Sequence, residues 1–200
     1  MLLYGAGGHA GVVAAVARDC GKEIKAFFDD NLQYGELSGI SVIGKYNPEL
    51  FVNEPIVITI GNNIIRRQIS CKIAHRFINL IHPSALVDKT VVVGTGTVIV
   101  HGCIIQANSM IGNHVIVNTG AIIDHDCKIE DYVHIAPGAV LCGNIFIGES
   151  SLIGAGSCIA PNIIIGKNCT IGAGSIVTKN IPDGAVVRGN SAEIIRINAL

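Results

Sequence analysis

The sequence has no tryptophan, and aromatic residues make up only 4% of its 200 residues, although half of the chain is hydrophobic. A core of this composition must be built from Val, Ile, Leu and Ala, and the chain has 24 glycines for its turns. This favours many short strands joined by tight turns over a helical bundle. The length is enough for one domain or for two small ones.

Strong net charge and long apolar runs are also missing. A formal charge of −1 at pH 7 gives no electrostatic argument for binding nucleic acid or an anionic membrane. No apolar run approaches the ~20 residues of a membrane-spanning helix. The N-terminal MLLYGAGGHAG has no basic segment and meets glycine too early for a signal peptide. We therefore expect a cytoplasmic protein without a membrane span and without a nucleic-acid partner.

The seven cysteines form no C-x-x-C pair, and their odd number argues against a disulfide framework. Scattered cysteines of this kind are typical of reduced thiols that pack as small apolar side chains. They are Cys20, Cys71, Cys103, Cys127, Cys142, Cys158 and Cys169.

The strongest pattern is a six-residue repeat that begins at Ala85. In sixteen successive hexads, from ALVDKT (85–90) to SIVTKN (175–180), the third residue is always Val, Ile or Leu. The fourth residue is often Gly and the first is often small. This period fits neither an α-helix nor a hairpin, and it indicates a left-handed parallel β-helix in which each hexad is a short strand plus a corner.

Three hexads close one triangular coil of eighteen residues, so sixteen hexads make slightly more than five coils. Successive coils stack at ~4.8 Å, the spacing of paired strands. Residues eighteen positions apart should therefore lie one above the other, with the third residue of each hexad pointing inward.

Residues 1–80 follow a different pattern. A short apolar strand leads into a glycine turn and a helix that carries Val12, Val13 and Val16 at helical spacing. The pattern further predicts strands over 24–31, 41–46 and 55–63, and a helix over 64–77. Alternating strands and helices indicate a small Rossmann-like parallel α/β domain. Pro83 interrupts the chain before the first hexad, so we expect an α/β domain over 1–80 and the β-helix over 81–200.

The segment GAGGHA (5–10) has the form G-x-G-x-x-A between a strand and a helix. Such a turn lets backbone N–H groups and a helix N-terminus approach phosphate oxygens closely. Asp29 and Asp30 end the next predicted strand, where a carboxylate can bind a ribose hydroxyl. A tight turn without a ligand is the alternative. Because about eighty residues form only half of a dinucleotide fold, a nucleotide carrying a sugar fits better than NAD(P).

A run of three titratable residues interrupts the aliphatic pattern in the hexad AIIDHD. Ile123 is the inward residue, so Asp124, His125 and Asp126 fall at a corner and point outward. A carboxylate that binds one imidazole nitrogen fixes the tautomer and raises the basicity of the other nitrogen. One coil further, Gly143 offers a backbone N–H for an oxyanion. A solvated corner without a catalytic role is the alternative.

Some β-helices bind zinc through three histidines, so the spacing of the histidines in the coils bears on a metal site. The intervals of 13, 11 and 9 residues match neither a five-residue step nor a whole coil, so we expect no metal site. The histidines are His101, His114, His125 and His134.

Motifs along the whole chain carry a family resemblance: GAGGHA, FFDDN, VIGKY, ITIGNNIIRR, LIHPSA, VNTGAIIDHDCKIEDYVHIAPGAVLCGN and VVRGNSAEIIR. With them the chain resembles the bacterial hexapeptide acyltransferases of the sialic acid O-acetyltransferase (NeuD-like) family, and most of all the PglD-type UDP-4-amino-sugar N-acetyltransferases. The resemblance implies a homotrimer with acetyl-CoA between adjacent subunits. It also implies that the N-terminal domain holds a nucleotide-activated amino-sugar.

The resemblance also implies roles for individual residues. His125 would be the general base, oriented by Asp124 and Asp126, and Asn118 also matches the catalytic pattern. Contacts to acetyl-CoA would come from His134, Gly143, Ala155 and Ala173. A surface histidine without a role is the alternative for His134. The nucleotide-sugar would be bound by Gly5, Gly7, Gly8, His9, Asp29, Asp30, Lys45, Gly61 and Asn62.

These residues predict direct acetyl transfer from acetyl-CoA to the amine of a UDP-4-amino-4,6-dideoxy sugar or a similar nucleotide-sugar. Cys127 begins a hexad and should point inward, which argues against an acyl-cysteine intermediate. Two alternatives remain at this point: O-acetylation of a sugar or of sialic acid, and a non-catalytic β-helix protein that binds a nucleotide-sugar.

Overall fold

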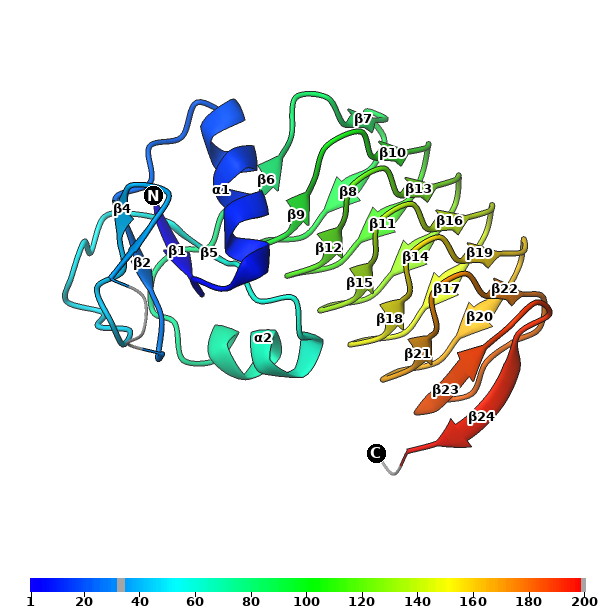
Figure 1. The fold of residues 1–200 in the computed structure, drawn as a ribbon. Helices are drawn as coiled ribbons and strands as arrows, with labels where there is room; N and C mark the ends of the chain where they lie inside the picture. Colours follow the sequence, from blue (N-terminus) through cyan, green and yellow to red (C-terminus); the bar gives the residue numbers. More distant parts are fainter. Residues whose placement is uncertain (32–34, 199–200) are drawn as a thin grey trace.

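The computed structural model describes residues 1–31 and 35–198, and it shows a small α/β segment beside a long β-helix (Figure 1). In the α/β segment three strands form a parallel sheet in the order β2-β1-β5, and β3 and β4 form a separate two-stranded sheet. The elements are β1 (Leu2–Tyr4), α1 (Gly8–Asp19), β2 (Ala26–Phe28), β3 (Glu36–Leu37), β4 (Ile40–Ser41), β5 (Ile56–Ile58) and α2 (Asn63–Ser70).

The three-stranded sheet is covered on both faces, which explains why every residue of its strands is buried. Leu3 and Phe27 pack with the valines and alanines of α1 on one face. Leu2 and Phe28 point the other way and pack with Ile69 of α2. Neighbouring strand residues point to opposite faces, so continuous apolar runs such as LLY and AFF fit a sheet that is buried on both sides.

The strands predicted over 24–31 and 55–63 are shorter than expected, because only β2 and β5 form there. Two further predicted elements are also shorter. The helix predicted over 64–77 ends at Ser70, because the chain then turns to pair Phe77 with Ile56 and to pack Phe77 on the sheet. The strand predicted over 41–46 survives only in β4 and in a bridge from Val42 to Phe27. Gly44, with φ of 88°, turns the chain away at that point.

The β-helix consists mainly of two-residue strands stacked in three parallel sheets (Figure 1). The β13 sheet contains β7 (Leu86–Val87), β10 (Ile104–Ile105), β13 (Ile122–Ile123), β16 (Val140–Leu141), β19 (Cys158–Ile159) and β22 (Ile176–Val177). The β14 sheet contains β8 (Val92–Val93), β11 (Met110–Ile111), β14 (Lys128–Ile129), β17 (Phe146–Ile147) and β20 (Ile164–Ile165). The β15 sheet contains β6 (Leu80–Ile81), β9 (Val98–Ile99), β12 (Ile116–Val117), β15 (His134–Ile135), β18 (Leu152–Ile153), β21 (Thr170–Ile171) and β23 (Ala185–Arg188), and β24 (Glu193–Ile197) joins its end antiparallel.

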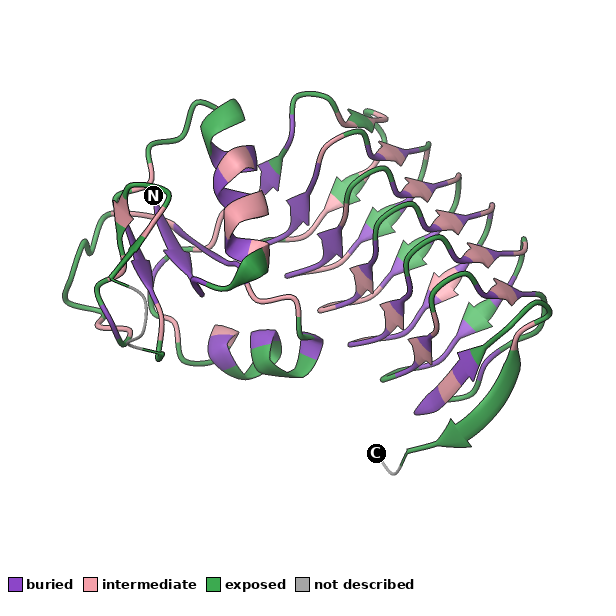
Figure 2. Ribbon diagram, viewed as in Figure 1, coloured by how far each residue is buried: buried purple, intermediate pink, exposed green. Residues whose placement is uncertain are grey.

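The register of these sheets confirms the predicted parallel β-helix. Ile105 pairs with Ile123, and Ile123 pairs with Leu141, so residues eighteen apart stack along each sheet. The inward third residues of the hexads form one continuous buried core, and each fully buried Ile contributes roughly 1.5–3 kcal/mol. Figure 2 shows this buried interior, whereas β24 is exposed along its whole length. The β13 sheet has six strands, so the solenoid makes about six turns.

The corners depend on a residue with left-handed backbone geometry at the sixth position of many hexads. Asp126 has φ of 59° and Asn144 has φ of 58°. Asp and Asn tolerate this region better than other residues with a side chain, because their short polar groups bond locally. Gly, Asn or Asp occupies most of these positions. The half-exposed Asp126 side chain therefore stands on the outside of its corner, which matters for the site below.

The α/β segment packs against the β15 sheet, and a buried arginine of α2 joins the two parts. Arg66 is 1% exposed and donates to the carbonyl oxygens of His114 (2.8 Å) and Tyr132 (2.7 Å). Asn63 donates to the carbonyl oxygen of Ser150 at 3.0 Å. Across residues 1–31 and 35–198, neither helix is long and apolar enough to cross a membrane.

Candidate active site

His125 lies at the corner between β13 and β14 and forms a short hydrogen bond with its neighbour. Its Nδ1 is 2.7 Å from Asp126 Oδ2, and its backbone N–H donates to Asp124 Oδ1 at 2.8 Å. The His125 and Asp126 side chains are 56% and 50% exposed, whereas Ile123 is fully buried. The corner thus carries three polar groups without placing any of them in the core.

The two carboxylates make His125 a stronger base. The hydrogen bond that His125 donates to Asp126, with the charge of Asp124, raises the pKa of the His125 imidazole. The same hydrogen bond, together with one from Asn108, lowers the pKa of Asp126. An ionised Asp126 only accepts, so Nδ1 carries the proton and Nε2 holds the lone pair in the neutral ring. Nε2 has no hydrogen-bond partner among the described residues, which leaves it available to take a proton.

Gly143 lies directly beside the His125 ring. A Cβ atom at Gly143 would be 2.6 Å from both Cε1 and Nε2 of His125, closer than packed atoms allow. Asn144 N–H donates to the His125 carbonyl at 2.9 Å, which holds the two coils in register. The Gly143 N–H has no acceptor in the described part of the chain. A base and a free N–H donor therefore share one corner.

Cys127 follows this corner but faces the interior, as its place in the hexad predicts. It is 1% exposed, and burial raises the pKa of its thiol. A buried thiol with a raised pKa is a poor nucleophile.

Asn118 and His134 lie elsewhere, on the side of the β-helix that faces the α/β segment. His134 Nδ1 is 3.2 Å from the carbonyl oxygen of Gly61, which can only accept, so Nδ1 carries the proton. Its Nε2 then accepts from the Asn118 amide at 3.2 Å. Burial, with the charge of Arg66, lowers the pKa of His134 to about 4, so the ring is neutral at pH 7.

A cavity of about 510 Å³ opens between the start of α2 and the β15 sheet. It brings together Gly61 and Asn62, predicted for the nucleotide-sugar, and His134, predicted for acetyl-CoA. Asn62 also caps α2, since its Oδ1 accepts from Ile65 N–H at 3.0 Å. The other lining residues are Asn63, Ile64, Ser150, Leu152, Asn168, Cys169, Thr170, Gly184 and Asn198.

The glycine turn between β1 and α1 has one crowded position and two open ones. Gly5 has φ of 106°, and a Cβ there would be 2.8 Å from Ile60 and 2.9 Å from Thr59. Among the described residues, nothing beyond the chain neighbours and the backbone of α1 lies within 4 Å of a Cβ at Gly7 or Gly8, and Gly7 is the N-cap of α1. Their backbone therefore faces open space at a helix N-terminus, the geometry that suits an anion.

The acidic pair beside this turn has partners within the protein. Asp29 accepts from the backbone N–H of Ala6 at 2.6 Å and of Asn31 at 2.7 Å, so both of its oxygens support the loops. Burial, together with the charge of Asp30, raises the pKa of Tyr4 to about 12. Asp30 is exposed.

Two further residues predicted to bind the nucleotide-sugar differ in exposure. Lys45 is exposed and follows Gly44, whose carbonyl accepts from Asp29 N–H. His9 lies on α1 with its ring centroid 6.1 Å from that of His134, and burial lowers its pKa to about 4.

Comparisons with known proteins match both halves of this architecture. Residues 1–73 match the PglD N-terminal domain, and residues 108–143 and 144–179 match the bacterial transferase hexapeptide. One similar solved structure is a histidine-to-asparagine variant of perosamine N-acetyltransferase from Caulobacter crescentus, in complex with CoA and GDP-perosamine. It is 32% identical in sequence and has a TM-score of 0.94, and the match covers 98% of this chain and 96% of that one. The chain belongs to the PglD-type hexapeptide acetyltransferases.

Two other relatives of this PglD-type protein carry informative names. The acetyltransferase domain of PglB from Neisseria gonorrhoeae, solved with acetyl coenzyme A, is 41% identical, with coverage of 97% of this chain and 98% of that one and a TM-score of 0.89. UDP-N-acetylbacillosamine N-acetyltransferase of Bacillus subtilis is 48% identical over 46 residues, 22% of this chain. The chain spans about a fifth of the length of the curated relatives it matches.

The residues predicted to bind acetyl-CoA do not gather in one place on a single PglD-type chain. Ala155 and Ala173 are exposed and stack at the corner that follows β18 and β21, where Gly174 N–H donates to the Ala155 carbonyl. Gly143 belongs to the corner beside His125 instead. His134 faces the α/β segment. One chain therefore carries these residues on three different sides.

Sequence reasoning missed the buried polar side of α2. Asn63, Arg66 and Ile69 are the buried residues of this helix, and only the last is apolar. Their spacing of three places them on one face of the helix. Polar residues at the buried positions of an amphipathic helix were the signal that could have revealed the contact with the β-helix.

Proposed function

We propose that this PglD-type protein transfers the acetyl group of acetyl-CoA to the amine of a nucleotide-linked amino-sugar, with His125 as the general base. The observation that carries the proposal is the corner itself, where Asp126 holds Nδ1 and leaves Nε2 free beside the Gly143 N–H. The relatives that are named for N-acetylation of GDP-perosamine and UDP-N-acetylbacillosamine support this substrate class. Our first candidate is a UDP-4-amino-4,6-dideoxy sugar.

In the proposed reaction, the neutral sugar amine attacks the thioester carbonyl carbon. A C–N bond forms, and His125 Nε2 accepts a proton from the nitrogen. The Gly143 N–H donates to the developing oxyanion. The C–S bond then breaks, and the imidazolium returns the proton to the departing CoA sulfur. Asp126 keeps Nδ1–H in place and stabilises the imidazolium while it exists, and Asp124 adds to this charge.

We also propose that the active enzyme is a homotrimer. The corner that carries His125 follows β13, whereas the α/β segment packs on the β15 sheet, at the other side of the same β-helix (Figure 1). A nucleotide-sugar held by the glycine turn and by the cavity at Gly61 would therefore face the His125 corner of a neighbouring subunit. Acetyl-CoA would lie between the two subunits, along Ala155 and Ala173 of one of them.

We place this reaction in the cytoplasm. All seven cysteines are free thiols. Free thiols persist in compartments that keep proteins reduced.

The test is an assay of thiol release from acetyl-CoA with a panel of UDP-, dTDP- and GDP-linked amino-sugars, with product identified by mass spectrometry. Each amino-sugar is paired with its hydroxyl analogue. We expect acetylation of an amino-sugar and none of its hydroxyl partner. Transfer to the hydroxyl analogue alone would establish an O-acetyltransferase instead. Absence of acetyl-CoA binding would overturn the enzyme assignment.

The role of His125 is tested by His125→Ala. We expect kcat to fall by ~10²–10⁴-fold, the usual contribution of a positioned proton acceptor, with the dissociation constant for acetyl-CoA nearly unchanged. The unfolding transition should barely move, because the side chain is largely exposed. A variant that keeps most of its kcat at neutral pH would show that the triplet is a solvated corner.

A further inference from the structure

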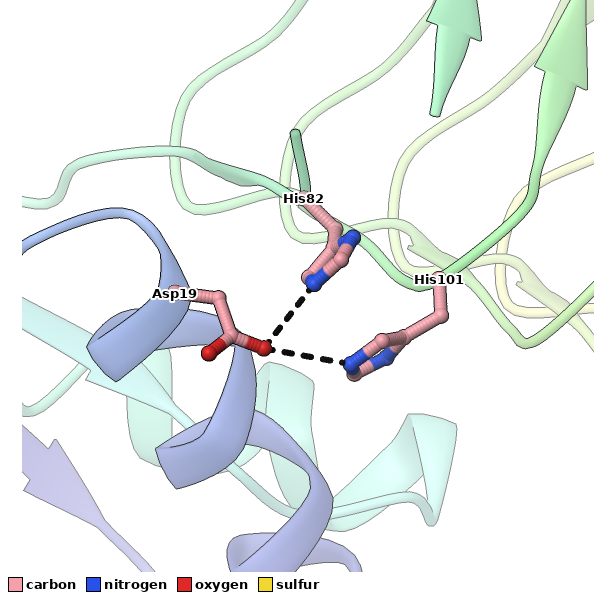
Figure 3. A group of neighbouring side chains, drawn as sticks. All are labelled: Asp19, His82 and His101. Atoms are coloured by element: carbon pink, nitrogen blue, oxygen red, sulfur yellow. Dashed lines mark hydrogen bonds and ion pairs between the residues drawn. The ribbon is translucent and has the colours of Figure 1, made fainter. Parts of the chain in front are cut away.

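Three potential metal ligands meet where the α/β segment touches the first coils of the β-helix (Figure 3). They are the Asp19 carboxylate at the last residue of α1, and the imidazoles of His82 and His101. Asp19 Oδ2 is 3.0 Å from His82 Nε2 and 3.5 Å from His101 Nε2. All three ligand atoms lie within 4.8 Å of one another.

The β-helix itself brings the two imidazoles together. His82 follows β6 and His101 comes two residues after β9, and these strands pair in register through Leu80 with Val98 and Ile81 with Ile99. The ring centroids are 3.7 Å apart, with an angle of 30° between the planes. His82 is 9% exposed, so packing fixes its ring. Two nitrogens are thus presented side by side by rigid backbone.

An aspartate carboxylate is ionised at neutral pH, as a metal ligand must be. Figure 3 shows the carboxylate of α1 pointing toward both rings. A negative charge and two imidazoles form the ligand set that zinc and other divalent transition metals prefer.

The outer nitrogen of His82 contacts Ser84 twice, and the ring proton would have to move to this nitrogen when a metal binds. Its Nδ1 lies 2.7 Å from Ser84 Oγ, and that oxygen also accepts from Gly102 N–H at 3.0 Å. With a metal on Nε2, the His82 proton would sit on Nδ1 and be donated to Ser84 Oγ, as is usual for metal-bound histidines, and the Ser84 N–H would lose Nδ1 as its acceptor. Without a metal, Nδ1 accepts from Ser84 N–H at 3.0 Å and Nε2–H is donated to Asp19.

We propose that Asp19, His82 and His101 form a binding site for a divalent transition-metal ion. Zinc binds nitrogen and oxygen ligands at about 2.0–2.2 Å, which places tetrahedral ligand atoms about 3.3 Å apart. The two distances of 3.0 and 3.5 Å bracket this value. Asp19 and His101 are about two-fifths exposed, so solvent completes the coordination.

The bound ion would tie the C-terminal end of α1 to the first two coils. Its role is structural, because acetyl transfer at the His125 corner uses none of these residues. The histidine spacing considered from the sequence did not include His82, which precedes the first hexad. His82 and His101 are nineteen residues apart, one coil plus one residue, and only the fold shows that α1 brings Asp19 between them.

The test is titration of the metal-stripped, full-length protein with Zn²⁺ alone, followed by calorimetry and by the thermal unfolding midpoint. We expect one tight site and a rise in the midpoint, because a ligand that binds the folded state stabilises it. Asp19→Asn and His101→Ala should each weaken Zn²⁺ binding by about 10–100-fold and remove most of that rise. Asn at position 19 can still accept from His82, so this variant should fold normally.

Two variants control for zinc captured elsewhere. His125→Ala removes the exposed histidine–carboxylate pair of the other corner, and Cys20→Ser removes the thiol next to the cluster, which donates to the Ile81 carbonyl at 3.2 Å. Both should keep the tight site and the rise in midpoint. Zinc binding that is equal in wild type, Asp19→Asn and His101→Ala, or no tight binding in wild type, would show that the cluster is only a hydrogen-bonded contact.

Discussion

Asp126 has a left-handed backbone conformation and, from that position, holds the ring of the adjacent His125 at 2.7 Å. Asn is equally suited to this conformation, so Asp126→Asn removes the charge while the corner is kept. Because the carboxylate raises the pKa of His125, the variant should have a lower His125 pKa and be a weaker base. The expected loss in kcat is smaller than that of His125→Ala.

The pH profile separates this effect from a structural one. In the wild type, kcat should fall as the pH drops through the raised pKa of His125, since the protonated ring accepts no proton. In Asp126→Asn the same fall should occur at lower pH. Measurement of kcat between acidic and mildly alkaline pH, with both substrates saturating, gives the comparison. An acid limb that stays at the same pH would show that His125 is not the group that titrates.

Gly143 provides a second test at the residue scale. Gly143→Ala keeps the backbone N–H but places a Cβ 2.6 Å from the His125 ring, so the ring must move. Ala107 occupies the equivalent corner position one coil before His125, which shows that the corner backbone accepts a Cβ. We expect at least a tenfold loss in kcat with an unchanged unfolding midpoint, measured by steady-state kinetics and calorimetry. Unchanged kcat would mean that the ring position is not critical.

At the scale of the element, α2 makes its contact with the β-helix through a buried cation that has no carboxylate partner in the part of the chain that the structure describes. Burial lowers the pKa of Arg66 to about 9, which still leaves it protonated at neutral pH. Its compensation comes from oxygen acceptors on both sides of the contact, among them the carbonyls of Ile60, His114 and Tyr132. These bonds fix the position of α2 and of the cavity at its N-terminus.

Arg66→Met should therefore be strongly destabilising. Several buried carbonyl groups would lose their donor, and each such loss costs about 1–3 kcal/mol, so we expect the free energy of unfolding to fall by about 3 kcal/mol or more. Arg67→Met is the matched control, because Arg67 is 52% exposed and makes one ion pair with Glu149 at 3.2 Å. A change within about 1 kcal/mol is expected there. Equal effects in denaturant unfolding would contradict this account of the contact.

The elements also show how far the sequence could be read in advance. The sixteen hexads specify the β-helix because burial of one branched residue per strand repeats without interruption, and the stacking of Gly143 beside His125 follows from the same period. The end of α2 and the missing strand after Val42 depend on packing of Phe77 and on a turn at Gly44. Such contacts join distant residues, and local periodicity does not contain them.

The candidate site could be predicted only where all of its residues lie in the hexad repeat, as His125 and Gly143 do. The contact of His134 with Gly61 joins the β-helix to a loop about seventy residues earlier. The hydrogen bonds from Arg66 of α2 to the carbonyls of His114 and Tyr132 also join the α/β segment to the β-helix. Neither follows from the eighteen-residue rule, because the α/β segment has no repeat that fixes its position relative to the coils.

At the scale of the whole molecule, the separation of His125 from the α/β segment predicts function shared between subunits. We expect light scattering to give a mass three times that of the 20.9 kDa chain. A second test mixes two impaired chains, His125→Ala and Gly7→Val, by coexpression with different tags. A Cβ atom at Gly7 has no atom of residues 1–31 or 35–198 within 4 Å beyond its chain neighbours and its own helix backbone, so this variant should fold and lose mainly affinity for the nucleotide-sugar.

Mixed trimers should be more active than either parent at low nucleotide-sugar concentration, because some sites combine an intact turn from one subunit with an intact His125 from the next. Activity equal to the average of the parents would place both groups in one subunit. A monomer at micromolar concentration would exclude a shared site.

The position of a residue in the β-helix sequence sets both its height along the axis and the direction in which it faces, because eighteen residues complete one revolution. A whole coil inserted between β6 and His125 would move the His125 corner by ~4.8 Å along the axis and leave its direction unchanged. A single inserted hexad would rotate that corner by a third of a revolution, onto another side of the solenoid relative to the α/β segment. The number of residues before His125 therefore sets the direction in which this corner faces. Natural variants of this enzyme should differ in length there only by multiples of eighteen residues.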